Sequence, residues 1–243
     1  LHLLLVFSLG VFVMRSAGCV INDYADRKID GKVERTKNRP LVNGTMSPLE
    51  AINLFGVLIG IALGLVLTLS WPTIYLATVA LFLAALYPFM KRYTQLPQVF
   101  LGAAFSWGMI MAFAEAQGDV PLIAWLLFAA HLCWTVAYDT MYAMVDREDD
   151  IKIGVKSTAV LFGDNDKRII GFLQLITLGL LWTVGNILAF GWPYQLCVIG
   201  AAGLFSYQQL LIVNRERNAC FQAFLHNHWV GLVIFIGITI EYL

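Results

Sequence analysis

The sequence contains few charged residues. Only 13% of its 243 residues are Asp, Glu, Lys or Arg, whereas 59% are hydrophobic. A soluble domain carries roughly 25% charged residues, so this composition excludes an ordinary soluble fold and indicates a polytopic membrane protein. The formal net charge is zero. We expect the lipid bilayer as its surroundings, with no nucleic-acid partner and no obligate protein partner.

Cysteine is scarce as well, and a basic N-terminal flank is missing. The four cysteines are isolated and form no C-x-x-C pair, so the sequence predicts neither disulfide bonds nor a zinc site. Residues 1–21 run directly from apolar into charged residues, which argues against a signal peptide. Because Leu1 already lies inside the apolar run, we expect the chain to be truncated at its N-terminus.

Most of the chain consists of apolar runs of about 20 residues, the length of a membrane-spanning helix. They cover residues 1–21, 49–70, 73–90, 98–116, 121–144, 168–190, 193–213 and 221–241. None alternates with period two, as a membrane β-strand would. The sequence therefore predicts one all-α integral-membrane domain over residues 1–243, with eight helices. In the second helix Gly56, Gly60 and Gly64 recur at intervals of four and predict a ridge for close helix packing.

Basic residues are absent from every second connection between these helices. Fifteen of the 16 Lys and Arg residues, all except Arg15, fall at 27–39, 91–92, 147–168 and 215–217, and none lies near 71–72, 117–120 or 191–193. Lys and Arg accumulate in cytoplasmic loops. We therefore expect the basic connections, and the acidic residues among them, to face the cytoplasm.

The first of these connections is the most polar stretch in the N-terminal half. From Asn22 to Pro40 it reads N-D-Y-A-D-R-K-I-D-G-K-V-E-R-T-K-N-R-P. On a helix that turns 100° per residue, Asp23 and Asp30 lie about 20° apart and Asp26 about 60° away. Three carboxylates on one face repel one another unless a cation binds to them. The spacing N-D-x-x-D-x-x-x-D therefore predicts a cation site at the membrane boundary.

A second acidic stretch, Y-D-T-M-Y-A-M-V-D-R-E-D-D, follows the fifth apolar run. On a continued helix Asp139, Tyr142, Asp146 and Asp150 fall within about 80° of one another and share a face. Asp139 lies seven residues before Asp146, which places it about 10 Å deeper in the membrane. We expect Asp146 and Asp150 at the mouth of a site and Asp139 inside it.

Two acidic stretches on one membrane face, each mixed with Lys and Arg, fit a charge-dense anion that is bound through divalent cations. Mg²⁺ usually takes one or two carboxylates together with substrate phosphates. Because the surroundings are lipid, we expect the rest of the anion to be lipid too. The pattern predicts an isoprenyl diphosphate, with its head at the cytoplasmic mouth and its chain between the helices.

The stretch from Asn22 to Asp30 resembles the first motif of the UbiA superfamily of intramembrane prenyltransferases. D-x-x-Y-x-x-x-D-x-x-x-D, from Asp139 to Asp150, resembles its second motif. Y-P-F-M-K-R-Y-T-Q-L-P-Q and V-D-R-E-D-D-I-K-I-G-V-K-S-T-A are similar to the members that act on 4-hydroxybenzoate in bacterial ubiquinone biosynthesis. The resemblance covers essentially the whole chain. It implies nine helices, eight of them present here, around a cavity that opens to the cytoplasmic side of the bacterial inner membrane.

The resemblance also implies a reaction, that of an Mg²⁺-dependent aromatic prenyltransferase. A polyprenyl group would pass from polyprenyl diphosphate to the ring carbon ortho to the hydroxyl of 4-hydroxybenzoate, giving 3-polyprenyl-4-hydroxybenzoate and diphosphate. The implied metal ligands are Asn22, Asp26 and Asp30 for one ion and Asp146 and Asp150 for the other, with Asp23 beside the first set.

Three residues are candidates for catalysis: Asp139, Tyr142 and Arg92. Asp139 is deep enough to orient the acceptor hydroxyl or to accept a proton. Arg92 is favoured over Lys91 for the acceptor carboxylate because a guanidinium binds it through two parallel hydrogen bonds. The candidate substrate-binding cations are Arg15, Arg35, Arg39, Lys91, Arg92, Lys152 and Lys156.

Other functions remain open at this stage. A related prenyltransferase with a naphthoate, homogentisate or tetrapyrrole acceptor would carry the same motifs. An intramembrane aspartyl protease also uses a Tyr-Asp pair, which Tyr138 and Asp139 offer, but its Gly-x-Gly-Asp partner is missing. A cation transporter would continue its ionisable residues through the bilayer, whereas the outer half has only Glu115, Asp119 and Glu241.

Overall fold

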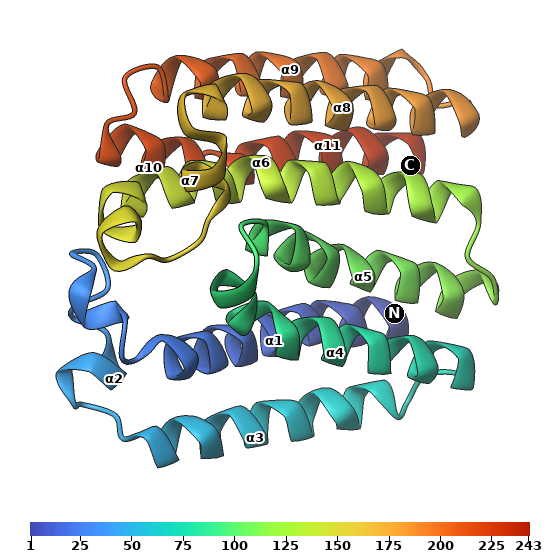
Figure 1. Cartoon of the computed structure of the whole chain (residues 1–243). Helices are drawn as coiled ribbons and strands as arrows, with labels where there is room; N and C mark the ends of the chain where they lie inside the picture. The colour runs from blue at the N-terminus through green and yellow to red at the C-terminus, as the bar shows by residue number, and fades with distance from the viewer.

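The computed structural model describes residues 1–243 and consists of helices without any strand (Figure 1). The elements are α1 (His2–Asp26), η1 (Asp30–Lys32), α2 (Pro40–Asn43), α3 (Pro48–Val66), α4 (Trp71–Tyr93), α5 (Pro97–Gln117), α6 (Leu122–Ile153), α7 (Thr158–Phe162), η2 (Gly163–Asn165), α8 (Asp166–Ile187), α9 (Trp192–Leu211), α10 (Arg217–Leu225) and α11 (Asn227–Glu241). The prediction of an all-α membrane bundle is confirmed.

Every predicted apolar run is helical, but the count of membrane-length apolar helices is seven rather than eight. The exception is α9, a helix of 20 residues. Gln195, Gln208 and Gln209 lower its hydropathy, and Gln208 is fully buried against Gln174 of α8, to which it is hydrogen-bonded at 3.0 Å. Polar groups inside a bundle are tolerated where a neighbouring helix satisfies them.

Proline and serine set where several helices begin. The first turn of α3, α4, α5 and α9 contains a proline: Pro48, Pro72, Pro97 and Pro193, respectively. Backbone N–H groups in the first turn have no partner within the helix, so proline, which has no N–H, costs no hydrogen bond there. At α3 the Ser47 side chain accepts from the backbone N–H of the residue three positions on, whose carboxylate accepts in return. These residues determine where α3, α4, α5 and α9 begin.

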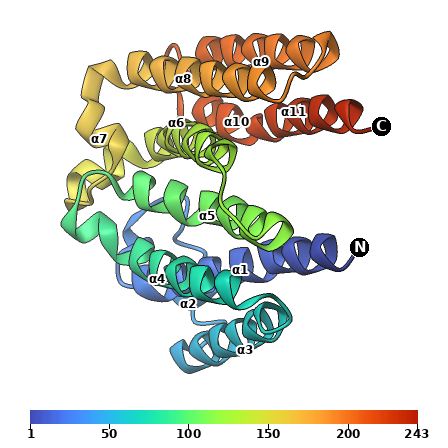
Figure 2. The same ribbon diagram turned by 90° about the vertical axis from the view of Figure 1, so that its right-hand side faces the viewer.

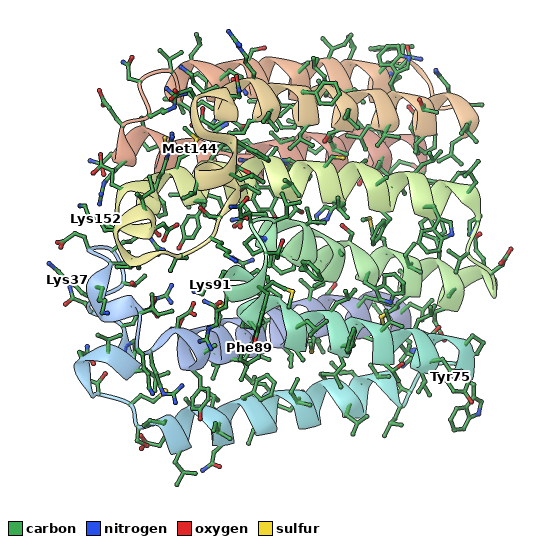
Figure 3. The ribbon with its side chains drawn as sticks, in the orientation of Figure 1. Lys37, Tyr75, Phe89, Lys91, Met144 and Lys152 are labelled. Atoms are coloured by element: carbon green, nitrogen blue, oxygen red, sulfur yellow. The ribbon has the colours of Figure 1, made fainter.

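The helices pack as layers, with α3 at one edge of the bundle and α8 and α9 at the other (Figures 1 and 2). The basic connections gather at one end, opposite both chain termini (Figure 1). Lys37 and Lys152 lie at this end, Tyr75 lies at the other, and Lys91 is on the basic side of the bundle (Figure 3). The even alternation of the basic residues along the chain thus corresponds to a single face of the fold.

The predicted glycine ridge is wrong. A Cβ atom added at Gly56, Gly60 or Gly64 would meet nothing within 4 Å, because α3 turns other residues toward α1. The buried side chains of α3 are two alanines, Ala51 and Ala62, on the opposite side. Spacing alone shows that a ridge exists but not which face of the helix is covered.

Candidate active site

One cavity at the basic end of the bundle brings the two acidic stretches together. Its lining includes Asn22, Asp26 and Asp30 from the first stretch, Asp139, Tyr142, Asp146 and Asp150 from the second, and the cations Arg35, Arg39, Lys91 and Lys156. These residues come from α1, the loop after it, α4, α6 and the segment that follows α6. Segments more than 100 residues apart in sequence therefore form one charged site.

The first acidic stretch does not continue as one helix, contrary to the prediction. α1 ends at Asp26, the chain turns through a hydrogen bond of 2.7 Å from the Ile29 N–H to the Asp26 carbonyl, and Asp30 begins a 3₁₀ turn. The Thr36 hydroxyl fixes this turn by donating to the Asp30 carbonyl at 2.8 Å. Asp26 and Asp30 thus reach the cavity by a turn of the backbone, whereas Asp23 is not part of the lining.

Each of three cavity aspartates pairs with a cation of the protein itself. Lys91 of α4 contacts Asp26, and the Arg39 guanidinium lies 2.9 Å from Asp30. Arg35 binds Asp146 with its Nε at 3.1 Å and also with its Nη2. The mutual repulsion expected among the carboxylates is therefore relieved by Lys and Arg side chains.

Arg35 connects the two acidic stretches. It comes from the loop of the first, hydrogen-bonds Asp146 of the second, and places its guanidinium 4.4 Å from the centre of the Tyr142 ring. Burial lowers the pKa of Arg35, but the hydrogen bonds to Asp146 outweigh this and raise the pKa above its usual value. The side chain is a permanent cation held over an aromatic face.

The donor set fits Mg²⁺ together with a phosphate ligand. Asp26 has one buried carboxylate oxygen, Oδ1, without any hydrogen-bond partner. No three His, Cys, Asp or Glu side chains converge on one point that would hold a metal by themselves. Mg²⁺ usually keeps waters and takes only one or two carboxylates beside substrate phosphates, so separated aspartates around a cavity suit it.

Four predicted site residues lie outside the cavity lining. Asp23 pairs with Arg39 at 2.7 Å at its edge. Arg92 donates to the Ala25 carbonyl at 2.7 Å and so joins α4 to α1. Lys152 is exposed and lies 3.6 Å from Asp149. Arg15 lies on α1 and has no carboxylate partner.

The cavity also includes polar residues that the sequence did not single out, among them Tyr87, Gln98 and Ser157. Gln98 is buried, accepts from the Thr158 N–H at 3.2 Å, and lies beside Asp139. Tyr87 precedes Lys91 by four residues, and this spacing on one helix face was a usable signal. Gln98 ends the stretch Y-P-F-M-K-R-Y-T-Q-L-P-Q, but only the fold, which brings α7 against α5, shows its place in the cavity.

The outward face of the second acidic stretch is fixed by the C-terminal helices. Asp166, at the start of α8, is fully buried and accepts from Arg215 at 2.8 Å and from Arg147 at 3.3 Å. Arg217 of α10 binds Glu148 and Asp149, both at 3.1 Å. These pairs fix the orientation of α6 about its own axis, and in this orientation Asp146 and Asp150 face the cavity.

A helical membrane bundle with a cavity of aspartates and cations at one end is an integral-membrane enzyme built to handle a charged group beside lipid. The chain belongs to the UbiA prenyltransferase family, whose family model matches residues 1–231. It is therefore a prenyltransferase of the membrane, as its motifs predicted.

Curated relatives match the chain along its length. It is 84% identical over 243 residues to the 4-hydroxybenzoate octaprenyltransferase of Colwellia psychrerythraea, covering 100% of this chain and 85% of the relative. It is 62% identical over 240 residues to the enzyme of the same name from Sodalis glossinidius, with 99% and 83% of the two chains covered.

Solved structures confirm the fold. A UbiA homolog from Aeropyrum pernix K1, in its apo form, matches with a TM-score of 0.88 at 25% identity and covers 100% of this chain and 90% of its own. A UbiA homolog from Archaeoglobus fulgidus bound to GPP and Mg²⁺ matches with a TM-score of 0.67 at 18% identity, over 100% and 89% of the two chains. The second likeness concerns the fold alone.

Proposed function

We propose that this protein transfers a polyprenyl group, an octaprenyl group in its curated relatives, from polyprenyl diphosphate to 4-hydroxybenzoate in ubiquinone biosynthesis. The observation that carries the proposal is the 84% identity over the whole chain to a 4-hydroxybenzoate octaprenyltransferase. The cavity supports it, because it offers both carboxylates and cations next to the membrane interior.

The diphosphate head group would bind among Arg35, Arg39, Lys91 and Lys156, which all line the cavity. Asn22, Asp26 and Asp30 would hold one Mg²⁺ and Asp146 and Asp150 a second. Bound there, Mg²⁺ supplies positive charge that stabilises the departing diphosphate. The unpartnered Oδ1 of Asp26 supports this placement.

The reaction joins the prenyl C1 to the acceptor ring. The allylic C1–O bond breaks and its electron pair leaves with the diphosphate, while the ring carbon ortho to the hydroxyl forms a bond to C1. Loss of the proton from that ring carbon restores aromaticity. Asp139 lines the cavity on the inner side of Tyr142 and is positioned to orient the acceptor hydroxyl or accept a proton.

Arg15 is the better candidate for the acceptor carboxylate than Arg92. Neither arginine is part of the cavity lining, but Arg92 is engaged with the Ala25 carbonyl. Arg15, on α1, has no ion-pair partner, so its guanidinium is available to a carboxylate ligand. An acceptor held between Arg15 and Asp139 would place its carboxylate and its hydroxyl at two different residues.

The basic end of the bundle, with the cavity mouth, would face the cytoplasm of a bacterial inner membrane. All connections rich in Lys and Arg lie at this end, in accordance with the charge bias of membrane proteins.

A membrane assay with 4-hydroxybenzoate and isoprenyl diphosphates of several lengths, with and without Mg²⁺, tests the function. We expect Mg²⁺-dependent formation of 3-polyprenyl-4-hydroxybenzoate. Parallel reactions with a naphthoate and with homogentisate test the related acceptors. Transfer to one of these and none to 4-hydroxybenzoate would replace the proposed acceptor.

A further inference from the structure

A groove lies between α8 and α9 on the outside of the bundle, and its lining shares no residue with the charged cavity. The two helices lie side by side at one edge of the molecule (Figures 1 and 2). The groove has a volume of about 260 Å³ and is lined by Leu178, Gly179, Trp182, Val198, Ile199 and Ala202. A Cβ atom added at Gly179 would meet nothing within 4 Å, and Trp182 and Ile199 are 37% and 56% exposed. This α8–α9 groove is therefore open to the surrounding lipid.

An unpaired cation lies on the same face of α8, at the basic end of the bundle. At 100° per residue, Arg168, Gly179 and Trp182 fall within about 60° of one another around the helix axis. Arg168 is exposed and forms no ion pair, and the nearby carboxylate of Asp166 is bound by two other arginines. At 1.5 Å per residue, Arg168 lies about 16 Å along the helix from Gly179. Positive charge therefore lies in line with the groove.

A second cation and an amide group complete the basic end of the groove. The Lys167 Nζ donates to the Val213 carbonyl at 2.8 Å and so connects the start of α8 to the chain just after α9. One turn deeper, the Gln209 side chain of α9 reaches α8, since a Cβ atom added at Gly171 would lie 3.5 Å from its Nε2. This Nε2 donates to Gln174 at 2.9 Å and has a second N–H for a further acceptor. Along the groove, positive charge is thus followed by an amide donor and then by apolar side chains.

This order is the order of groups in a glycerophospholipid, which has a phosphate, then ester carbonyls, then acyl chains. One acyl chain spans half of the hydrocarbon core, about 15 Å, close to the distance from Arg168 to Gly179. Basic pockets between membrane helices bind anionic headgroups. We propose that the α8–α9 groove binds one phospholipid with an anionic headgroup, such as phosphatidylglycerol. Its phosphate lies at Lys167 and Arg168, an ester carbonyl accepts from Gln209, and one acyl chain lies along Gly179 and Trp182.

Native mass spectrometry of the purified chain in detergent, titrated with phosphatidylglycerol or with phosphatidylcholine of the same acyl chains, tests the headgroup site. We expect one phosphatidylglycerol to be retained per chain, more tightly than phosphatidylcholine. Arg168→Ala should weaken phosphatidylglycerol binding by roughly fivefold, the contribution of one cation near a membrane surface. Lys37→Ala is the matched control, because it removes the same charge from the basic end, in the loop after α1 (Figure 3), and it should leave the affinity unchanged.

A glycine substitution tests the acyl-chain part of the groove. Gly179→Phe fills the open space with an apolar side chain and should weaken phosphatidylglycerol binding as Arg168→Ala does. Gly60→Phe on α3, at the opposite edge of the bundle, is its control, since a Cβ atom there also meets nothing within 4 Å, and it should change nothing. Gel filtration confirms that each variant is folded.

Three results would overturn the proposal. Equal losses of affinity in Arg168→Ala and Lys37→Ala would show a general attraction of charge to the basic end, without a site. Unchanged binding in Gly179→Phe would show that no acyl chain lies in the groove. Farnesyl diphosphate is the competitor, because it is also an anion with an apolar chain, and its displacing phosphatidylglycerol at equal concentration would replace the phospholipid with an isoprenoid anion as the occupant.

Discussion

At the scale of single residues, the main feature of the site is that its acidic side chains bind the protein's own cations. The sequence predicted both sets of residues but not their pairs. Lys91 follows its partner Asp26 by 65 positions and Asp146 follows Arg35 by 111. No periodicity connects residues so far apart, and only the packing of α4 and α6 around the loop brings them together.

Asp26→Ala should abolish prenyl transfer while the protein still inserts into the membrane. The substitution removes a carboxylate that lines the cavity and has a free oxygen, which is the group expected to bind Mg²⁺. Transfer in isolated membranes, with the amount of protein checked by immunoblot, measures it. Asp23→Ala is the matched control because Asp23 pairs with Arg39 outside the lining, and it should keep most activity. Substantial Mg²⁺-dependent turnover of Asp26→Ala would contradict the metal assignment.

Arg15→Ala should raise the KM for 4-hydroxybenzoate by roughly tenfold or more, the value of a lost hydrogen bond to a charged group. The KM for the prenyl diphosphate should change little. Initial rates at varied concentrations of each substrate provide both constants. Arg92→Ala is the comparison, and we expect a smaller effect on the acceptor. The opposite ranking of the two variants would return the carboxylate to Arg92.

Asp139→Asn should keep binding of the prenyl diphosphate and lose most of kcat. The amide preserves shape and hydrogen bonding but cannot accept the proton or hold the acceptor hydroxyl as a carboxylate does. Binding is measured with labelled diphosphate and turnover with the transfer assay. Near-normal kcat would give Asp139 a structural role, and lost diphosphate binding would instead place it among the metal ligands.

At the scale of elements, the orientation of α6 depends on contacts that lie outside the cavity. The sequence predicted one shared face for Asp139, Tyr142, Asp146 and Asp150, and all four line the cavity. It did not predict that Asp166 of α8 would be buried and paired with Arg147 of α6. The reason is physical: helical periodicity states which residues share a face, whereas the direction of that face is decided by neighbouring helices.

Asp166→Ala should lower the free energy of unfolding by roughly 2 kcal/mol. Breaking a buried ion pair strands its partners, and the loss is moderated here because Arg215 reaches water. The melting temperature of the protein in detergent measures the effect. Glu148→Ala is the control, because Glu148 is 77% exposed on α6, and its change should stay within about 0.5 kcal/mol. Equal melting temperatures for the two variants would contradict this role of Asp166.

At the scale of the whole molecule, composition and charge alternation predicted the architecture well. The apolar runs are helices, and the basic connections share one end of the bundle. The predictions failed at three places: the glycine ridge of α3 is uncovered, α9 is too polar to count as an apolar span, and α1 stops at Asp26. For the glycine ridge the covered face depended on a neighbouring helix, whereas the end of α1 is set by hydrogen bonds in the loop that follows it and the polarity of α9 by its own glutamines.

Because three cavity aspartates are paired with the protein's own cations, a metal ion or an anionic ligand would exchange places with these internal partners. Under the proposed assignment, Mg²⁺ alone would compete with Lys91, Arg39 and Arg35 for the paired aspartates, and a diphosphate alone would draw those cations away from their carboxylates. When both bind, the aspartates would hold Mg²⁺ and the released cations would bind phosphate oxygens. We therefore expect the two ligands to bind with positive heterotropic coupling, and by thermodynamic linkage each would tighten the binding of the other by the same factor. Calorimetric titration of one ligand in the absence and in the presence of the other would display that factor directly.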